Sequence, residues 1–295
     1  MACYNGGRFL PAQLASFADQ SVSNWILWAS DDGSTDNTLA ILKDFQTERS
    51  DGKMRLLSGP QDGAAMNFLS MLYHPELPDQ PCALADHDDV WLPQKLAHIL
   101  PLIDVPQPVL YAGRTLVSDA NLEHQRPSKP LSPAPSFENA LIQNRAAGNT
   151  IVLNQAALRA LRNIGAPDQI AHHDWWLYQI MTGIGARVIF DETPLVIYRQ
   201  HGTNVLGANE GSMQTLRRMI QLMGQDWRGW ANVQHKALQA ARHHLTPQNQ
   251  HILDTWRAAP KAGISRGRVF KQLGLHRHKP AQTSLMVFLA ILGRI

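Results

Sequence analysis

Apolar positions in the first 115 residues follow two alternating patterns. Around Leu10, Leu14 and Phe17 the apolar residues recur every three or four positions, as on one face of a helix. Short continuous apolar runs at residues 25–30 and 54–58 are typical of buried strands. Strands that alternate with helices predict an α/β fold with a mostly parallel sheet, covered by helices on both faces.

The same patterns continue along the chain and predict the remaining elements. Helices are predicted at residues 39–45, 66–72, 137–144 and 155–163, at the entry Trp91–Pro93, and from Asp174 onward. Strands are predicted to end at Ala85 and to span residues 109–113, 149–153, 186–190 and 194–198. From Met213 onward the spacing of Leu216, Met219, Ile220 and Met223 predicts a helix. Residues 121–136 are rich in Pro and Ser and are expected to form an exposed loop.

The composition is that of a globular protein. The 295 residues are 44% hydrophobic and 17% charged, which excludes the disordered class. The two cysteines, Cys3 and Cys82, give no disulfide framework and favour a reducing compartment. We find no signal peptide pattern and no apolar run of about 18 residues. The sequence therefore predicts a cytoplasmic protein without a transmembrane helix.

Charge is distributed unevenly along the chain. Residues 1–205 carry 14 Lys and Arg against 21 Asp and Glu, whereas residues 206–295 carry 13 against 3. After Asp254 there are eight Lys or Arg and no acid. An acidic body with a basic tail predicts two different tasks on one chain.

Two groups of acids directly follow predicted strands. One is Asp31 with Asp32, and the other is Asp86, Asp88 and Asp89. Ligands of parallel sheets bind beyond the carboxyl ends of the strands, so these acids lie where a ligand is expected. Each group could also cap the following helix, where acids are favourable. A cap needs only one carboxylate, whereas the second group has three carboxylates that repel one another. A hard cation (Mg²⁺ or Mn²⁺), with phosphate oxygens completing its coordination shell, would relieve this repulsion.

Five sequence segments, taken together, resemble a known family. ACYNGGRFL, SDDGSTDNT and ADHDDVW are similar to consecutive motifs of family 2 glycosyltransferases, which adopt the GT-A nucleotide-sugar fold. HHDWWLYQI and YRQHGTNVLG resemble the bacterial rhamnosyltransferase-like branch. The family begins with an apolar strand before this first motif, so we expect either a truncated start or a nearly absent first strand. The resemblance implies a nucleotide-sugar-binding half at 1–115, an acceptor-binding half at 116–210 and a basic helical extension at 211–295.

The resemblance also implies the residues of a metal and diphosphate site. Asp88 is expected to be a metal ligand, and Asp86 is expected to face the metal or the ribose. Asp89 is a further candidate of this group. His201 would add a late metal ligand, and Arg199 would contact the diphosphate.

The nucleotide base and the acceptor have their own candidate residues by the same resemblance. Asp31 or Asp32 would accept the imide N–H of uracil or thymine, and Tyr4 would stack on the base or line its site. Asp174 would act as the catalytic base, taking the proton of the acceptor hydroxyl in an inverting transfer. Trp175 and Trp176 would offer a sugar platform, and Gly148 with Asn149 would lie on the acceptor side.

The resulting functional hypothesis is an inverting glycosyltransferase that uses a nucleotide sugar with Mg²⁺ or Mn²⁺. The donor is expected to be dTDP-L-rhamnose, and the acceptor a polysaccharide or a lipid-linked oligosaccharide of the bacterial envelope, including one carried by a polyprenyl lipid. Donors such as UDP-hexoses and UDP-N-acetylhexosamines stay open. A nucleotidyltransferase and a non-catalytic sugar- or nucleic-acid-binding protein are the other classes, and no nucleic-acid partner is expected.

The C-terminal tail combines basic residues with a short apolar run. Residues 265–280 are basic, and residues 284–295 are too few to span a bilayer. One interpretation is a helix that packs on the rest of the protein. The other is peripheral contact with an anionic membrane, at the inner face of the cytoplasmic membrane.

Overall fold

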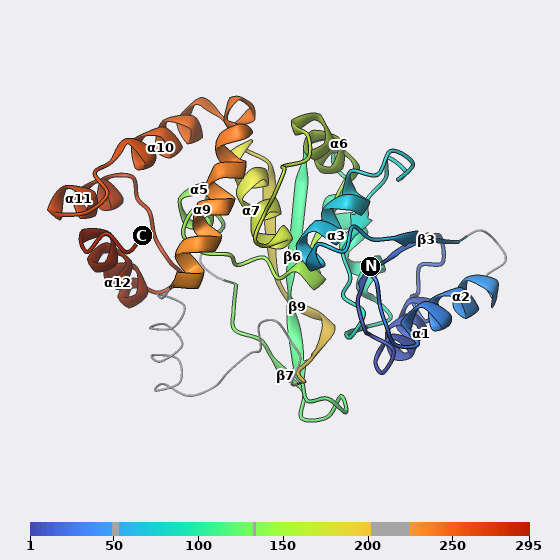
Figure 1. Cartoon of the computed structure of the whole chain (residues 1–295). Helices are drawn as coiled ribbons and strands as arrows, with labels where there is room; N and C mark the ends of the chain where they lie inside the picture. Colours follow the sequence, from blue (N-terminus) through green and yellow to red (C-terminus); the bar gives the residue numbers. More distant parts are fainter. Residues whose placement is uncertain (49–52, 132–133, 202–224) are drawn as a thin grey trace. The chain divides into compact units, whose positions relative to one another are not determined.

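The computed structural model describes residues 1–48, 53–131, 134–201 and 225–295 (Figure 1). The chain divides into two compact units. The first comprises Met1–Leu131, Ala146–Ala166 and Ile189–Ala208, and the second comprises Ser132–Arg145, Pro167–Val188 and Asn209–Ile295. Because the chain passes repeatedly from one unit to the other, each unit contains segments that are far apart in sequence. The predicted boundaries at residues 115 and 210 stay predictions.

A three-stranded parallel sheet forms one part of the first unit. Its strands lie in the order β1, β2, β3, and helices connect them. The elements are β1 (Ala2–Cys3), α1 (Leu10–Ala18), β2 (Leu27–Asp31), α2 (Thr38–Glu48), β3 (Met54–Ser58) and α3 (Gly63–Leu72). The first strand is thus present as two residues. Cys3 pairs with Asp31, and Asp31 pairs with Ser58, so the three strands end together at one edge.

A second sheet completes this unit. Its strand order is β4-β8-β6-β9-β5, with β7 beside β6. The elements are β4 (Cys82–Ala83), β5 (Val90–Trp91), α4 (Lys95–Ile103), β6 (Val109–Ser118), β7 (Arg126–Pro127), η1 (Gly148–Thr150), β8 (Val152–Leu153), α6 (Gln155–Ile164) and β9 (Arg187–Arg199). The predicted α/β class with helices around the sheets is confirmed. The pairs β1–β2 and β2–β3 of the first sheet are parallel. In the second sheet, β4–β8, β5–β9, β6–β7 and β6–β8 are antiparallel, a pairing that needs no helical crossover.

Two local predictions are wrong because sheet pairing overrides the sequence pattern. Trp91 does not enter a helix: it pairs with Val196 in the sheet, and α4 begins only at Lys95. The two strands predicted between residues 186 and 198 are one strand, since β9 continues through Pro194. The Trp91 ring packs edge-on against Phe17, with ring centroids 4.7 Å apart, which fixes α1 against the second sheet.

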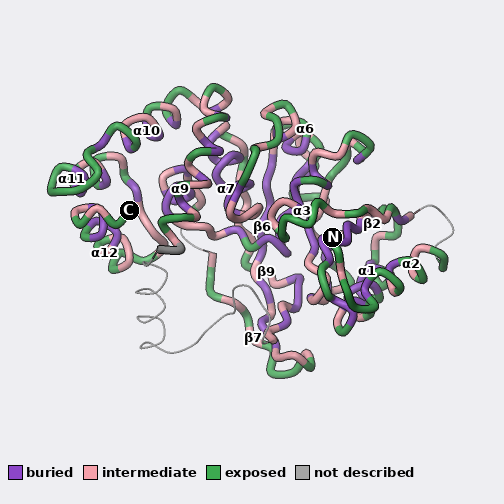
Figure 2. The backbone as a smooth tube through the Cα atoms, in the orientation of Figure 1, coloured by how far each residue is buried: buried purple, intermediate pink, exposed green. Residues whose placement is uncertain are grey.

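The second unit is helical. It contains α5 (Phe137–Ala140), α7 (His173–Gly183), α9 (Gln225–Ala240), η2 (Arg242–His244), α10 (Pro247–Ala258), α11 (Ile264–Gln272) and α12 (Pro280–Ile291). Helix α7 is buried along nearly its whole length, as the tube in Figure 2 shows. The predicted helical positions Leu216 to Met223 lie outside the described residues. Among the helices that are described, none has both the length and the apolar character needed to cross a bilayer.

Candidate active site

The first two motifs, residues 2–10 and 30–38, bond to each other at the carboxyl ends of β1 and β2. The backbone N–H of Gly7 donates to Oδ2 of Asp36 over 2.9 Å. In return, the N–H of Thr35 donates to Oδ1 of Asn5 over 2.8 Å. Each bond runs from the backbone of one motif to a side chain of the other. Together they fix the position of the two loops relative to each other.

The third motif joins them through β1 and a glycine. Ala2 and Asp86 form a parallel bridge, so the chain after β4 lies beside β1. A Cβ atom on Gly6 would overlap the His87 ring, and this close approach is possible because position 6 is glycine. The acids that follow β4 therefore lie beside the first motif, as the sequence predicted from strand ends.

The acids of the third motif form a cluster. Asp86, Asp88 and Asp89 each place a carboxylate oxygen within 4.8 Å of the others. Nε2 of His201, which follows β9, lies 2.9 Å from Oδ2 of Asp88, and both side chains are largely buried. The structure thus brings together the three residues expected to hold a metal: Asp86, Asp88 and His201.

Asp89 is the structural member of this cluster. It is fully buried, and it accepts hydrogen bonds from the Asn149 side-chain amide (2.5 Å) and from the Arg199 backbone N–H (3.3 Å). Burial raises its pKa, and the charges of Asp86 and Asp88 raise it further. Asn149 therefore directs its amide to Asp89. This bond ties η1 and the end of β9 to the acidic loop.

Lys95 is a buried cation that the sequence analysis did not single out. Its Nζ donates to the Asn149 carbonyl over 3.2 Å and lies 3.6 Å from the centre of the Trp91 ring. Burial lowers its pKa to about 7. The sequence did contain a signal for Lys95: it is a lysine at the first position of a helix whose other residues are mostly apolar.

Phe9 is the second residue near the cluster that the sequence did not single out. Its ring centroid lies 4.6 Å from the His201 ring and 4.7 Å from the guanidinium carbon of Arg199. Arg8 also lies near this ring, at 4.9 Å. Phe9 thus contacts the imidazole that bonds Asp88, and it links α1 to the acidic cluster.

Arg199 holds loops of the same unit together. Its Nε donates to the Asp88 carbonyl (2.9 Å) and its Nη1 donates to the Ala120 carbonyl (2.6 Å). Burial lowers the pKa of the guanidinium. Its predicted contact with the diphosphate stays a prediction.

Asp31 and Asp32 are buried and already accept hydrogen bonds. Asp31 accepts from the N–H and the hydroxyl of Ser34, whereas Asp32 accepts from the backbone N–H groups of Gln61 and Gly63. A carboxylate has about four lone-pair sites, so an imide N–H could still be accepted. Tyr4 is 56% exposed, so its ring is accessible to a ligand. The base-binding roles stay predictions.

Asp174 belongs to the second unit, where it lies in the first turn of α7. Its Oδ1 accepts from the Trp175 N–H over 2.7 Å. Its role as the base stays a prediction. Trp175 and Trp176 are only 3% and 1% exposed, so the prediction of a sugar platform is wrong. Both rings lie in the helical core, where Trp175 donates its indole N–H to the Ala140 carbonyl.

The donor atoms of the cluster fit a hard divalent cation. Carboxylate oxygens and one imidazole nitrogen suit Mg²⁺ or Mn²⁺, and a cation would relieve the repulsion that raises the Asp89 pKa. Asp86, Asp88 and His201 would hold it. Asp89, the further candidate of this group, also holds the loop through its hydrogen bonds with Asn149 and Arg199.

Comparisons with known proteins agree with this geometry. The family model described as glycosyl transferase family 2 matches residues 1–163. The dTDP-rhamnosyl transferase RfbG of Shigella flexneri is 28% identical over 218 residues, which cover 71% of this chain and 74% of RfbG.

Two solved structures share the fold at low identity. TarS 1–349 of S. aureus, in complex with UDP-GlcNAc, has 13% identity and a TM-score of 0.55, covering 92% of this chain and 87% of its own. The mannosyltransferase PcManGT of Pyrobaculum calidifontis, with GDP-Man and Mn²⁺, has 14% identity and a TM-score of 0.50, covering 99% and 84%.

Proposed function

The chain belongs to glycosyl transferase family 2, and from this premise we propose that it transfers L-rhamnose from dTDP-L-rhamnose, with inversion, in a metal-dependent reaction. The observation that carries metal-dependent transfer is the cluster of Asp86, Asp88 and His201 at the strand ends, beside the interlocked first two motifs. The observation that favours rhamnose is the similarity to RfbG over 71% of the chain.

The donor site follows from the residues of the first unit. Tyr4, which follows β1 and is exposed, would stack on the thymine ring, and Asp31 or Asp32 would accept the imide N–H of the base. Asp86, Asp88 and His201 would hold Mg²⁺ or Mn²⁺. When bound, the cation supplies positive charge that stabilises the departing nucleoside diphosphate.

Transfer to the acceptor requires a base that takes up the hydroxyl proton. We assign this role to Asp174, which takes the proton of the acceptor hydroxyl as the oxygen attacks the anomeric carbon. The bond from that oxygen to the anomeric carbon forms while the bond to the diphosphate breaks, and the configuration inverts. The proposed acceptor is a growing polysaccharide or a polyprenyl-linked oligosaccharide of a bacterial envelope. The proposed location of the enzyme is the cytoplasm.

A donor panel tests the activity. The protein is incubated with dTDP-L-rhamnose, UDP-glucose, UDP-galactose or UDP-N-acetylglucosamine, with Mg²⁺, Mn²⁺ or a chelator, and released nucleoside diphosphate is measured. We expect release from dTDP-L-rhamnose that the chelator abolishes. Preferential use of a UDP-sugar would overturn the assignment of rhamnose while leaving glycosyl transfer in place. A product that retains the anomeric configuration would overturn the inverting mechanism.

A second measurement tests the metal site without turnover. Mn²⁺ at about 100 times its dissociation constant should stabilise the wild-type protein by about 2.7 kcal/mol, which thermal unfolding detects. Asp88→Ala should lose this stabilisation and the release of nucleoside diphosphate. Asp191→Ala is the matched control, because Asp191 also bonds a histidine (His98, 2.7 Å) but lies outside the motif loops. Equal stabilisation of wild type and Asp88→Ala by Mn²⁺ would show that the cation binds elsewhere.

A further inference from the structure

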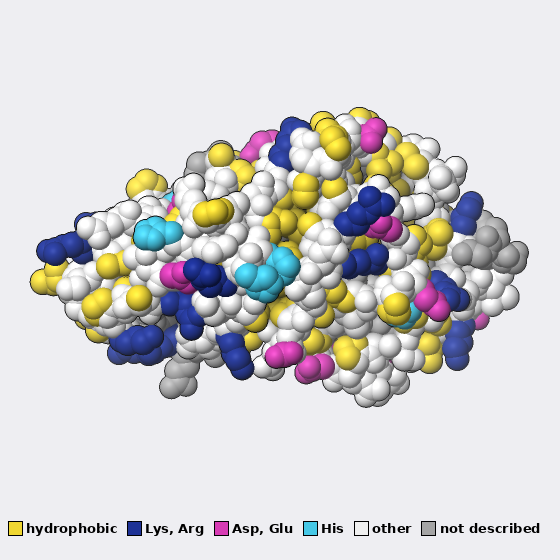
Figure 3. Space-filling view, turned by 90° about the horizontal axis from the view of Figure 1, so that it is seen from above, with side chains coloured by type: hydrophobic (Ala, Val, Ile, Leu, Met, Phe, Trp, Pro, Cys, Tyr) yellow, Lys and Arg dark blue, Asp and Glu magenta, His cyan; other side chains and the backbone are white. Residues whose placement is uncertain are grey.

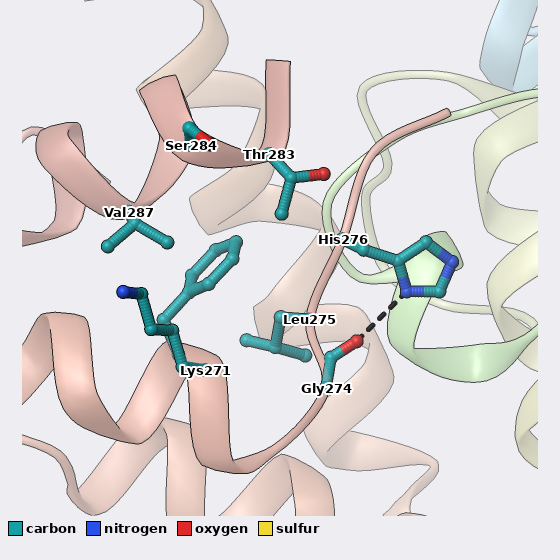
Figure 4. Close-up of a pocket in the computed structure, with 8 residues that line it drawn as sticks. Lys271, Gly274, Leu275, His276, Thr283, Ser284 and Val287 are labelled. Carbon is teal, nitrogen blue, oxygen red and sulfur yellow. Dashed lines mark hydrogen bonds between the residues drawn. The ribbon is translucent and has the colours of Figure 1, made fainter. Parts of the chain in front are cut away.

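Helices α11 and α12 form an antiparallel pair. The N–H of Gly263, before α11, donates to the carbonyl of Ile291, at the end of α12, over 2.8 Å. A Cβ on Gly267 would lie 2.6 Å from the Ile291 side chain, so the glycine allows the helices to approach closely. At the opposite end, Lys271 and Ser284 line one hollow of about 400 Å³ between the two helices (Figure 4). The start of α11 therefore lies beside the end of α12.

The exposed positions of this pair recur at helical spacing. They include Ile264, Arg268 and Lys271 on α11, and Ala281, Ser284, Phe288 and Leu292 along α12 and at its C-cap. Three large apolar side chains in this set are mostly exposed: Ile264 at 73%, Phe288 at 56% and Leu292 at 52%. The exposed stripe of α12 carries no charge. We call Ile264, Phe288 and Leu292 the apolar tip, because Gly263 bonds Ile291 and so brings Ile264 to the end of α12 that bears Leu292.

Basic side chains lie on α11, at both ends of α12 and on the segment before α11, and no acid follows Asp254. The exposed ones are Arg257, Lys261, Arg268, Lys271, Lys279 and Arg294. Figure 3 shows Lys and Arg next to hydrophobic side chains at the left end of the view, over the C-terminal helices. Lys261 and Arg294 adjoin the tip directly, since a Cβ on Gly293 would lie 3.1 Å from the Lys261 carbonyl. This surface is thus complementary to a partner that is both anionic and able to take up apolar side chains.

We propose that the exposed face of α11 and α12 binds the surface of an anionic lipid bilayer. The apolar tip enters the interface, and Arg268, Lys271 and their basic neighbours meet lipid phosphates. A nucleic acid would use the basic residues but would leave Phe288 and Leu292 in water. A helix of 12 residues is too short to span the bilayer, so the contact is peripheral. Only the purpose of this contact rests on the proposed function, since it would hold the enzyme beside a lipid-linked acceptor.

Vesicle flotation of the full-length protein tests the proposal without any donor or acceptor. We expect the protein to float with vesicles of equal parts phosphatidylcholine and phosphatidylglycerol, and to be released by high salt. Arg268→Gln with Lys271→Gln should weaken the partition about 25-fold, at about fivefold for each charge near the surface. Phe288→Ser with Leu292→Ser should weaken it by at least about tenfold, because two large apolar side chains no longer leave water.

The matched control is Ile26→Ser with Lys43→Gln. Ile26 is 52% exposed, like Leu292, and Lys43 is exposed, but both lie in the first unit. This variant should float like wild type. Equal flotation of all variants, equal binding to pure phosphatidylcholine, or no binding by the wild type would overturn the proposal. Concentration-dependent dimerisation that Phe288→Ser with Leu292→Ser abolishes, without vesicle binding, would also overturn it and identify a second copy as the occupant. A flotation result of either kind leaves the donor panel unaffected, so the two proposals fail separately.

Discussion

Two neighbouring aspartates of the acidic loop are expected to differ in how much the same substitution changes the free energy of unfolding. Asp89→Ala removes the acceptor of two buried donors, the Asn149 amide and the Arg199 N–H. Each buried donor without a partner costs about 1 to 3 kcal/mol. Relief of the repulsion with Asp86 and Asp88 returns about 1 to 2 kcal/mol of this. Two donors together cost about 2 to 6 kcal/mol, so after this return we expect Asp89→Ala to lower the free energy of unfolding by about 1 to 4 kcal/mol.

Asp88→Ala is the matched comparison, because it removes the same atoms one residue earlier. Its carboxylate bonds one histidine, and its removal also relieves like-charge repulsion. Loss of this bond costs about 1 to 3 kcal/mol and the relief of repulsion returns about 1 to 2 kcal/mol, so we expect a net change in the free energy of unfolding within about 1 kcal/mol. Urea unfolding at neutral pH without divalent metal, followed by tryptophan fluorescence, measures both variants.

A double-mutant cycle of Asp89→Ala with Asn149→Ala isolates the buried bond. The two side chains contact each other directly, so a coupling of about 1 to 2 kcal/mol is expected. Asp89→Asn should lie between wild type and Asp89→Ala, since an amide keeps one acceptor oxygen. The division of roles within the acidic loop is wrong if Asp89→Ala and Asp88→Ala unfold at the same urea concentration, or if the coupling is absent.

Three further predictions concern the base, a histidine and the ring beside the cluster. Asp174→Asn should leave donor affinity unchanged and lower turnover by about 10² to 10⁴; a parallel loss of donor affinity would place Asp174 in the donor site. Burial lowers the pKa of His173 to about 4, so the unfolded chain takes up the proton first, and stability falls as the pH drops from about 6.5 toward 4. The loss should be roughly 1 to 2 kcal/mol at pH 5, reduced because the ring keeps partial exposure, and urea unfolding of His173→Phe should show a smaller loss. Phe9→Leu should weaken Mn²⁺ binding about fivefold, since the contact that holds His201 is worth about 1 kcal/mol; unchanged affinity in a calorimetric titration would show that the ring does not position the imidazole.

The sequence by itself determined the α/β class and the place of the acids. Apolar runs of strand length and apolar spacing of helix period are local properties, so β2, β3, α1 and α7 could be predicted from them. The acids after β2 and β4 could be placed at strand ends for the same reason. The family resemblance implied which residues would bind a metal: two aspartates of one loop and one histidine late in the chain.

Only the tertiary structure decided which of these residues meet and which support them. Asp89 and Asp88 are adjacent and chemically identical in sequence, yet one is fully buried and the other bonds His201. Their difference comes from Asn149 and Arg199, which lie 60 and 110 residues away along the chain. Trp91 became a strand residue because β9 offered it a backbone partner, and Trp175 became a core residue because α5 covers it. Burial and long-range hydrogen bonding depend on packing across the fold, and no local pattern in the sequence encodes them.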